Sequence, residues 1–279
     1  MDNVPEAPAD VIFERDVPYR KGHDRWVLNV ITPKEESKVA RPAIVVVHGG
    51  GWGGNDHYRF SWLAFFLAQQ GYVVVAPTHR MIQDAPFPAC LEDIKNSIRW
   101  LRANAERYDV DTKRIGAYGN SSGGQLVLMA ALTGQMKLFD GDGPYREFSS
   151  EIQAVVGSGT VGDMQHAEHS ERAARVYRNL AGARSGKLSE EQISAVLKQA
   201  SPATYVSKET PPIMLVHGVR DDIVFVQSTD DFVEVMKEAG APISYLRYED
   251  GGHAVMFQKQ SETIPAMLKF FAKHLAAES

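Results

Sequence analysis

Runs of β-branched and other apolar residues alternate with helix-like segments along most of this chain, and this alternation limits the folds open to it. Eight runs have the length and composition of strands, and they span residues 11–17, 26–32, 43–48, 72–77, 114–118, 152–157, 212–218 and 243–249. Strands that alternate with helices build a mainly parallel sheet. The first two runs have no helix between them, so we expect an antiparallel entry. The sequence predicts an α/β fold, with a mainly parallel central sheet flanked by helices.

Two of the intervening segments have clear helical features. Residues 90–108 place Leu91, Ile94 and Ile98 on one stripe, with charged residues opposite. The segment 229–240 ends on a glycine, which suits a helix C-terminus. Both segments predict helices that pack one face against the sheet.

One stretch breaks the alternation. Residues 139–205 contain two helix-like pieces, 170–182 and 189–200, with polar joints and only one clear strand. We expect a small helical insertion or lid over the edge of the sheet, because lids are commonly built in this way. The chain as a whole is long enough for one large domain, so we predict a single domain over residues 1–279 that includes this insertion.

Composition limits the partners and the compartment. The net charge of −5 and the scattered basic residues argue against nucleic-acid or anionic-membrane partners and favour a neutral or modest-sized substrate. No run of about 18 apolar residues is present, so no membrane span is expected. The acidic start lacks the features of a signal peptide. We expect a soluble protein, cytoplasmic as given or secreted if a leader has been removed, and the sequence leaves its oligomeric state open.

The segment Gly119-Asn120-Ser121-Ser122-Gly123 fits the pattern GxSxG, with a strand-like run before it and a helix-like run after it. At such a sharp turn one residue is strained, and side chains two positions away on either side would collide unless they were hydrogen atoms. The glycines therefore make room for Ser121, whose hydroxyl is expected at the carboxyl end of the sheet. Close helix-to-strand packing is the alternative reason for such small residues.

The loop VVVHGGGWGG, residues 45–54, follows the most hydrophobic strand-like run. Its glycines allow a tight bend with bare amides, so Gly50 and Gly51 are expected to form an oxyanion hole with the amide of Ser122. A phosphate-binding loop is the alternative, but the Walker lysine and the GxGxxG spacing are missing. Trp52 either lines the pocket, as a candidate substrate-binding residue, or packs internally.

A serine hydroxyl needs a base to act as a nucleophile, and the base needs an orienting carboxylate. Among the nine histidines, His253 lies in a glycine-containing loop that follows a strand-like run. From there it is expected to reach Ser121. His217 also ends a strand-like run, but we interpret it as a loop-shaping residue. His166 and His169 are three residues apart with no third partner, so a solvated helix face is favoured over a metal site.

The candidate acids are Asp221 and Asp222, which follow another strand-like run. One of them can orient the imidazole while the other caps the turn or faces solvent, and the residues leave this choice open. Asp250 is a third candidate, but it lies only three residues before His253, which favours a turn-forming role. A chain order of serine, acid and histidine is that of serine hydrolases built on an α/β sheet.

Together these motifs give the chain a resemblance to a known family. The segments HGGGWGG, APFPACLEDIKNSIRWLRAN, RIGAYGNSSGG, HGVRDDIV and GGHA resemble those of α/β-hydrolase carboxylesterases with an HGGGW oxyanion loop. The resemblance extends to the hormone-sensitive-lipase-like group and to the bacterial feruloyl or acetyl-xylan esterase-like group. It covers most of the chain from about residue 43 onward.

The resemblance implies an α/β-hydrolase fold and a residue-by-residue assignment. Ser121 corresponds to the nucleophile and His253 to the base. The fifth position of HGxxDxxV carries the acid, which favours Asp221 over Asp222. The oxyanion amides of the family likewise correspond to those already inferred from the glycine loop and the helix start.

The predicted function is hydrolysis of short-chain acyl esters through an acyl-enzyme, with acetyl or feruloyl esters of sugars as candidate substrates. The partner is then a small-molecule ester, and no cofactor or metal is expected. An arylformamidase or a small amide or peptide hydrolase is the alternative, because the same triad cleaves amides. A non-catalytic binding protein on a hydrolase fold is a third hypothesis, but such a protein usually lacks a triad member.

Overall fold

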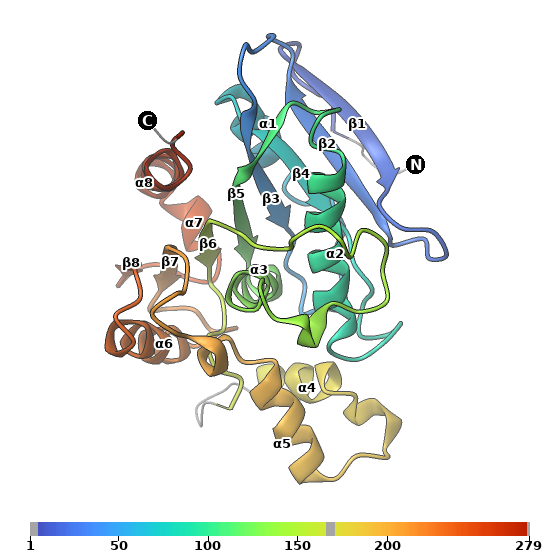
Figure 1. The fold of residues 1–279 in the computed structure, drawn as a ribbon. Coiled ribbons are helices and arrows are strands. Elements are labelled where there is room, and N and C mark those ends of the chain that lie inside the picture. Colours follow the sequence, from blue (N-terminus) through green and yellow to red (C-terminus); the bar gives the residue numbers. More distant parts are fainter. Residues whose placement is uncertain (1–4, 166–170, 278–279) are drawn as a thin grey trace.

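The computed structural model describes residues 5–165 and 171–277, and its centre is one eight-stranded sheet. The strands are β1 (Val11–Pro18), β2 (Val27–Pro33), β3 (Arg41–Val47), β4 (Val73–Pro77), β5 (Val110–Asn120), β6 (Ala154–Ser158), β7 (Ile213–Gly218) and β8 (Ile243–Tyr248). They lie in the order β1-β2-β4-β3-β5-β6-β7-β8 (Figure 1). Strand β2 pairs antiparallel with β1 and with β4, and all other neighbours are parallel.

Each predicted strand run coincides with one strand, and the antiparallel entry is confirmed. Strand β5 begins earlier than expected, at Val110. Its first residue pairs with Arg41 of β3, and the register shifts before the regular pairing that begins at Ile115. The polar residues between these two points carry no strand-like pattern, which is why the sequence did not predict them.

Eight α-helices connect and flank the strands in the described part of the chain. They are α1 (Ser61–Gln69), α2 (Ala89–Ala103), α3 (Ser122–Leu132), α4 (Glu171–Leu180), α5 (Glu190–Gln199), α6 (Val226–Glu238), α7 (Val255–Gln258) and α8 (Gln260–His274). The apolar stripe predicted for α2 is confirmed, because Leu91, Ile94 and Ile98 are fully buried.

Two hydrophobic cores lie on the two faces of the sheet. Successive side chains of a strand point to opposite faces. In β3, Val45 and Val47 therefore join the core that contains α2, α3 and α6, whereas Ile44 and Val46 join the core that contains α1 and α8. Burial on both faces explains the continuous valine and isoleucine runs that predicted these strands.

Helices α4 and α5 lie together at one end of the molecule, far from β1 and β2 (Figure 1). Helix α5 begins at a capping box in which Ser189 and Gln192 satisfy each other's backbone amides. The strand in the predicted insertion, β6, belongs to the central sheet, and α4 and α5 follow it. The role of residues 139–205 as a lid stays a prediction.

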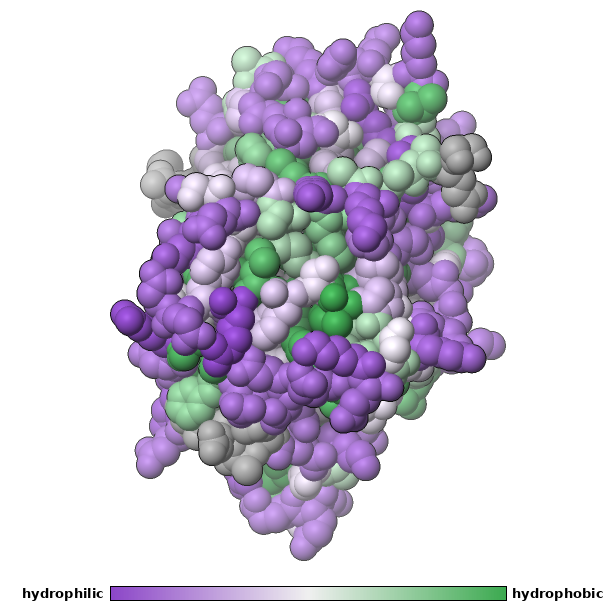
Figure 2. Space-filling model, turned by 90° about the vertical axis from the view of Figure 1, so that its left-hand side faces the viewer, coloured by the Kyte–Doolittle hydropathy of each residue, from purple (hydrophilic) through white to green (hydrophobic). Residues whose placement is uncertain are grey.

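The surface is mainly hydrophilic on the face drawn in Figure 2, where hydrophobic residues gather in a hollow near the middle. A hollow of this kind is a usual setting for a small-molecule site. In residues 5–165 and 171–277, every helix is too short or too polar to cross a membrane.

The core under β5 gives a test of the fold. Phe271 of α8 is fully buried, and a Cβ atom added to Gly116 would lie 2.9 Å from its ring. We expect Phe271→Ala to lower the free energy of unfolding by roughly 3–5 kcal/mol, because the cavity left behind cannot close completely. Leu138→Ala, at a side chain that is 65% exposed, should change it by less than about 0.5 kcal/mol. Urea denaturation of both variants measures the difference, and similar losses would contradict this packing.

Candidate active site

Ser121 lies at the sharp turn between β5 and α3. Its φ of +55° is in the left-handed region, which is strained for a residue with a side chain. The Ser121 amide donates a hydrogen bond to the carbonyl of Ser158 at 2.8 Å, and the hydroxyl of Thr160 donates to the carbonyl of Ser121 at 3.2 Å. These bonds fix the strained turn at the carboxyl end of the sheet.

The two glycines around Ser121 have the steric role expected from the sequence. A Cβ atom on Gly119 would lie 2.3 Å from the carbonyl oxygen of Gly123. A Cβ atom on Gly123 would lie 2.4 Å from the carbonyl oxygens of Val47 and His48. The turn can therefore form only where both positions lack a side chain.

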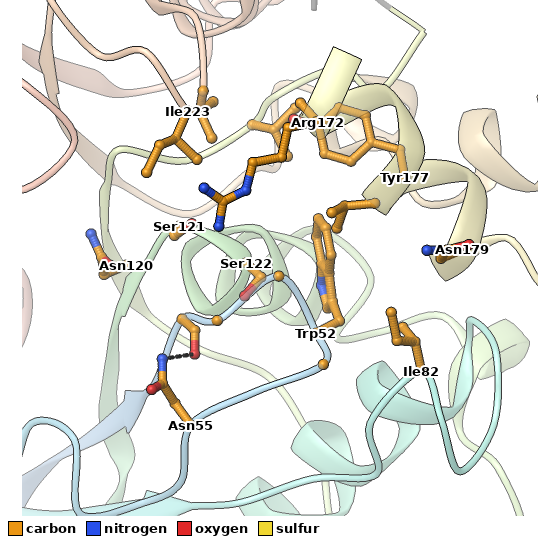
Figure 3. Close-up of a pocket in the computed structure, with 18 of the residues that line it drawn as sticks. Trp52, Asn55, Ile82, Asn120, Ser121, Ser122, Arg172, Tyr177, Asn179 and Ile223 are labelled. Carbon is orange, nitrogen blue, oxygen red and sulfur yellow. Dashed lines mark hydrogen bonds between the residues drawn. The ribbon is translucent and has the colours of Figure 1, made fainter. Parts of the chain in front are cut away.

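The glycine loop after β3 bends beside this turn. Gly50 has a φ of +126°, and a Cβ atom there would lie 2.3 Å from the carbonyl oxygen of Gly54. The side-chain amide of Asn55 donates to the carbonyl of Gly49 at 3.1 Å and closes the loop (Figure 3). Within the described residues, no hydrogen bond engages the backbone amides of the three predicted oxyanion residues, Gly50, Gly51 and Ser122, and all three line one cavity.

Two buried histidines pack against each other beside the loop. The ring of His48 stacks on that of His79 with centroids 4.9 Å apart, and His48 Nδ1 lies 2.9 Å from the carbonyl of Gly49. Burial, with a smaller contribution from His79, lowers the pKa of His48 to about 3. Burial lowers the pKa of His79 to about 4. Both rings are therefore neutral near pH 7, so they can shape the loop without adding a charge beside it.

Asp221 and His253 meet at the same end of the sheet. His253 Nδ1 donates to Asp221 Oδ2 at 2.8 Å, and His253 lines the cavity that Ser121 also lines. The other carboxylate oxygen, Oδ1, accepts from the amides of Ile223 and Val224 at 2.9 Å each. Asp222 is exposed, so the structure separates the two aspartates that the residues alone left as alternatives.

His217 also contacts Asp221. Its Nε2 lies 3.0 Å from Asp221 Oδ2, and its Nδ1 lies 2.7 Å from the hydroxyl of Thr229. Burial disfavours the charged carboxylate, but hydrogen bonds from His217 and His253 outweigh burial and hold the pKa of Asp221 well below its usual range. The carboxylate is therefore ionised at neutral pH and can keep the Nδ1 proton on His253. The loop-shaping role predicted for His217 thus extends to holding this acid.

The cavity has a volume of about 690 Å³. Trp52 forms part of its wall, and its indole Nε1 donates to Gln125 Oε1 at 3.0 Å. The rings of Tyr177 and Trp52 form a T-shaped pair with centroids 5.9 Å apart. The Trp52 side chain is 3% exposed, so it packs internally and also lines the cavity, while its contact with a substrate stays a prediction.

Helix α4 supplies part of the wall that the sequence did not predict. Arg172, Tyr177 and Asn179 lie beside Trp52 in Figure 3, and all three line the cavity. The helix itself was predicted, but its position over the carboxyl ends of the strands follows from tertiary packing. No local pattern in the sequence could have indicated these residues.

Metal binding has no support in the described residues, which contain no cluster of three or more histidine, cysteine, aspartate or glutamate side chains able to hold an ion. The pair His166 and His169, for which the sequence favoured a solvated helix face, lies outside the described residues. Cys90 is buried, and burial raises the pKa of its thiol to about 12, so it packs as a small apolar side chain.

The depressed pKa of His79 predicts a pH-dependent stability. As the pH falls from about 6.5 towards 4, the unfolded chain binds a proton that the folded protein excludes, so stability is lost across this window. His79→Gln removes the imidazole that binds this proton in the unfolded chain. We expect the free energy of unfolding of the wild type, relative to this variant, to fall by roughly 1–2 kcal/mol between pH 7.5 and pH 5. Urea denaturation at both pH values measures this difference, and a constant difference would contradict a neutral buried His79.

Comparisons with known proteins agree with this fold. The BD-FAE family matches residues 28–236. Esterase LipC of Mycobacterium tuberculosis is 28% identical over 230 residues, which are 81% of this chain and 56% of that protein. Arylacetamide deacetylase of Bos taurus is 34% identical over 120 residues, which are 41% of this chain and 29% of that protein.

Solved structures have the same architecture. A protein described as a truncated form of a carbohydrate esterase from gut microbiota has a TM-score of 0.87 at 27% identity, over 97% of this chain and 99% of that one. The chain spans about half the length of the curated relatives it matches. The BD-FAE match covers most of the 279 residues. The chain therefore belongs to the BD-FAE family and has the α/β-hydrolase fold, which confirms the resemblance drawn from its sequence motifs.

Proposed function

We propose that this chain is a serine carboxylesterase, with Ser121 as the nucleophile, His253 as the general base and Asp221 as the residue that orients the base. The observation that carries the proposal is the hydrogen bond from His253 Nδ1 to the buried Asp221, in a cavity that Ser121 also lines. The bond keeps a proton on Nδ1, and Nε2 of the neutral imidazole is the nitrogen proposed to accept the proton of the serine hydroxyl.

The reaction proceeds in two steps. Ser121 Oγ attacks the ester carbonyl carbon while His253 takes the hydroxyl proton, and His253 then returns the proton to the leaving alcohol. A water molecule, deprotonated by the same imidazole, releases the acid from the acyl-enzyme. Asp221 stabilises the imidazolium that forms in each step, because its carboxylate stays ionised.

The amides of Gly50, Gly51 and Ser122 are proposed to hold the oxyanion. The reasons are their position along the cavity and their freedom from other hydrogen bonds among the described residues. Ser122 also begins α3, so its amide carries the partial positive charge of a helix N-terminus. Fixed donors of this kind need no reorganisation when charge develops on the carbonyl oxygen.

Relatives support the ester class and leave a second candidate. LipC is named an esterase, and a structural neighbour is described as a carbohydrate esterase, which supports short acyl esters, including those of sugars. Arylacetamide deacetylase is named for an amide, which favours arylamides or formamides as the second candidate. Trp52 and α4 are proposed to contact the substrate, with α4 and α5 acting as its lid.

The triad assignment has a direct test with a matched control. Ser121→Ala should lower kcat/KM for para-nitrophenyl acetate by at least about a thousandfold, and Asp221→Asn by on the order of 10³–10⁴-fold. Asp222→Asn should leave it unchanged, because this neighbouring carboxylate is exposed and outside the cavity. Steady-state kinetics of the three folded variants measure these effects. Full activity of Ser121→Ala, or equal effects at the two aspartates, would contradict the proposal.

The substrate class is tested by an ester series with the wild type and Ser121→Ala. We expect para-nitrophenyl acetate and butyrate to be hydrolysed faster than the octanoate, because the cavity is closed on one side by Trp52 and α4. An acetylated xylan oligosaccharide and a feruloylated sugar test the alcohol side. Serine-dependent cleavage of formanilide without ester cleavage would instead favour the amide candidate.

A further inference from the structure

The cavity has an unusual charge for a protein with a net charge of −5. Three arginines line it, Arg59, Arg172 and Arg184, whereas no aspartate or glutamate is among its described lining residues. Overall composition favoured a neutral substrate, but the local balance of charge at the cavity is the opposite of the global one. A cleft with one sign of charge attracts ligands of the other sign.

The guanidinium groups of these three arginines also lack partners among the described residues. Within residues 5–165 and 171–277, no hydrogen bond or ion pair engages their guanidinium groups. Elsewhere on α4, Arg178 forms two hydrogen bonds to Glu190, which lies at the start of α5. The cavity-facing arginines therefore keep their donors available for a ligand.

Arg172 is the best placed of the three. It shares a helical face with Val176 and Asn179, at spacings of four and seven residues, and all three line the cavity. Figure 3 shows its side chain reaching into the cavity on the side of Ser121. Arg175, three residues later, does not line the cavity, and it lines a neighbouring depression that shares Asn179 with it. The orientation of α4 thus selects one arginine for the site.

We propose that the preferred substrate is an ester that also carries a carboxylate, and that Arg172 binds this carboxylate. The inference rests on the proposed esterase function and names its substrate class. A guanidinium presents a planar pair of donors that matches a carboxylate in a bidentate arrangement. Arg59 and Arg184 add positive potential at the same cavity. Arg172 is a specificity residue, while the ester bond is cleaved by the triad.

The test uses matched charged and neutral esters. One pair is para-acetoxybenzoate and its methyl ester, which place the charge on the alcohol side. The other is mono-para-nitrophenyl glutarate and para-nitrophenyl pentanoate, which place it on the acyl side. In at least one pair, the wild type should favour the charged member, and Arg172→Gln should lower kcat/KM for that member by about tenfold or more. The same substitution should change kcat/KM for the neutral member by less than about twofold.

Arg175→Gln is the matched control. It removes the same charge from the same helix outside the cavity, so a general loss of positive potential would affect both variants alike. The charged preference should also weaken as salt is raised, because the cavity arginines are exposed to solvent. Equal effects of the two substitutions, or no charged preference in either pair, would overturn the proposal.

A binding measurement separates this proposal from the esterase assignment. Calorimetry measures equilibrium binding of the uncleaved esters to Ser121→Ala. It reports the preference for the charged ester over the neutral one without turnover. Tighter binding of the charged member that is lost in Ser121→Ala combined with Arg172→Gln supports the proposal even if ester cleavage fails. Equal binding of both members overturns it, while Ser121-dependent cleavage of the neutral esters would leave the esterase assignment intact.

Discussion

The strained turn at Ser121 is the constraint on which the rest of the site depends. A left-handed backbone at a residue with a side chain costs about 1–3 kcal/mol and persists only where its surroundings enforce it. Here the sheet on one side and α3 on the other enforce it. The bond from the Ser121 amide to Ser158 ties the turn to β6, and the contact of Gly123 with the backbone of β3 ties it to the glycine loop. The proposed nucleophile and the proposed oxyanion amides are thus fixed by one packing arrangement.

The charged groups around the site differ in burial, and their burial determines which of them carry a charge. The carboxylate of Asp221 is buried but ionised, because two histidines and two backbone amides satisfy it. His48 and His79 are buried and neutral, so they add no positive charge beneath the loop. Arg59, Arg172 and Arg184 are exposed and have no partner within residues 5–165 and 171–277, and at such a solvent-exposed position an arginine without a partner costs little free energy. The proposed triad therefore lies in the interior, and the arginines proposed to meet a substrate lie at the rim.

The sheet positions the proposed reacting groups, and the helices above it form part of the cavity wall. Ser121, Asp221 and His253 all follow strands of the parallel part of the sheet, so their positions are tied to its hydrogen bonding. Trp52 comes from the adjacent loop, and α4, whose Tyr177 packs on Trp52, adds the neighbouring part of the cavity wall. A rigid sheet with added helices allows the substrate to change while the reacting groups stay in place.

The sequence by itself determined the strands, the parallel sheet and the turn at Ser121, because each depends on side-chain periodicity or on glycines close in the chain. The residues alone left Asp221 and Asp222 open as the acid, and the family resemblance favoured Asp221. In the folded protein Asp221 is buried and Asp222 is exposed. Only the tertiary structure decided that Arg172 faces the cavity. A helix encodes its own faces through its spacing, but the surface it covers depends on how distant segments pack.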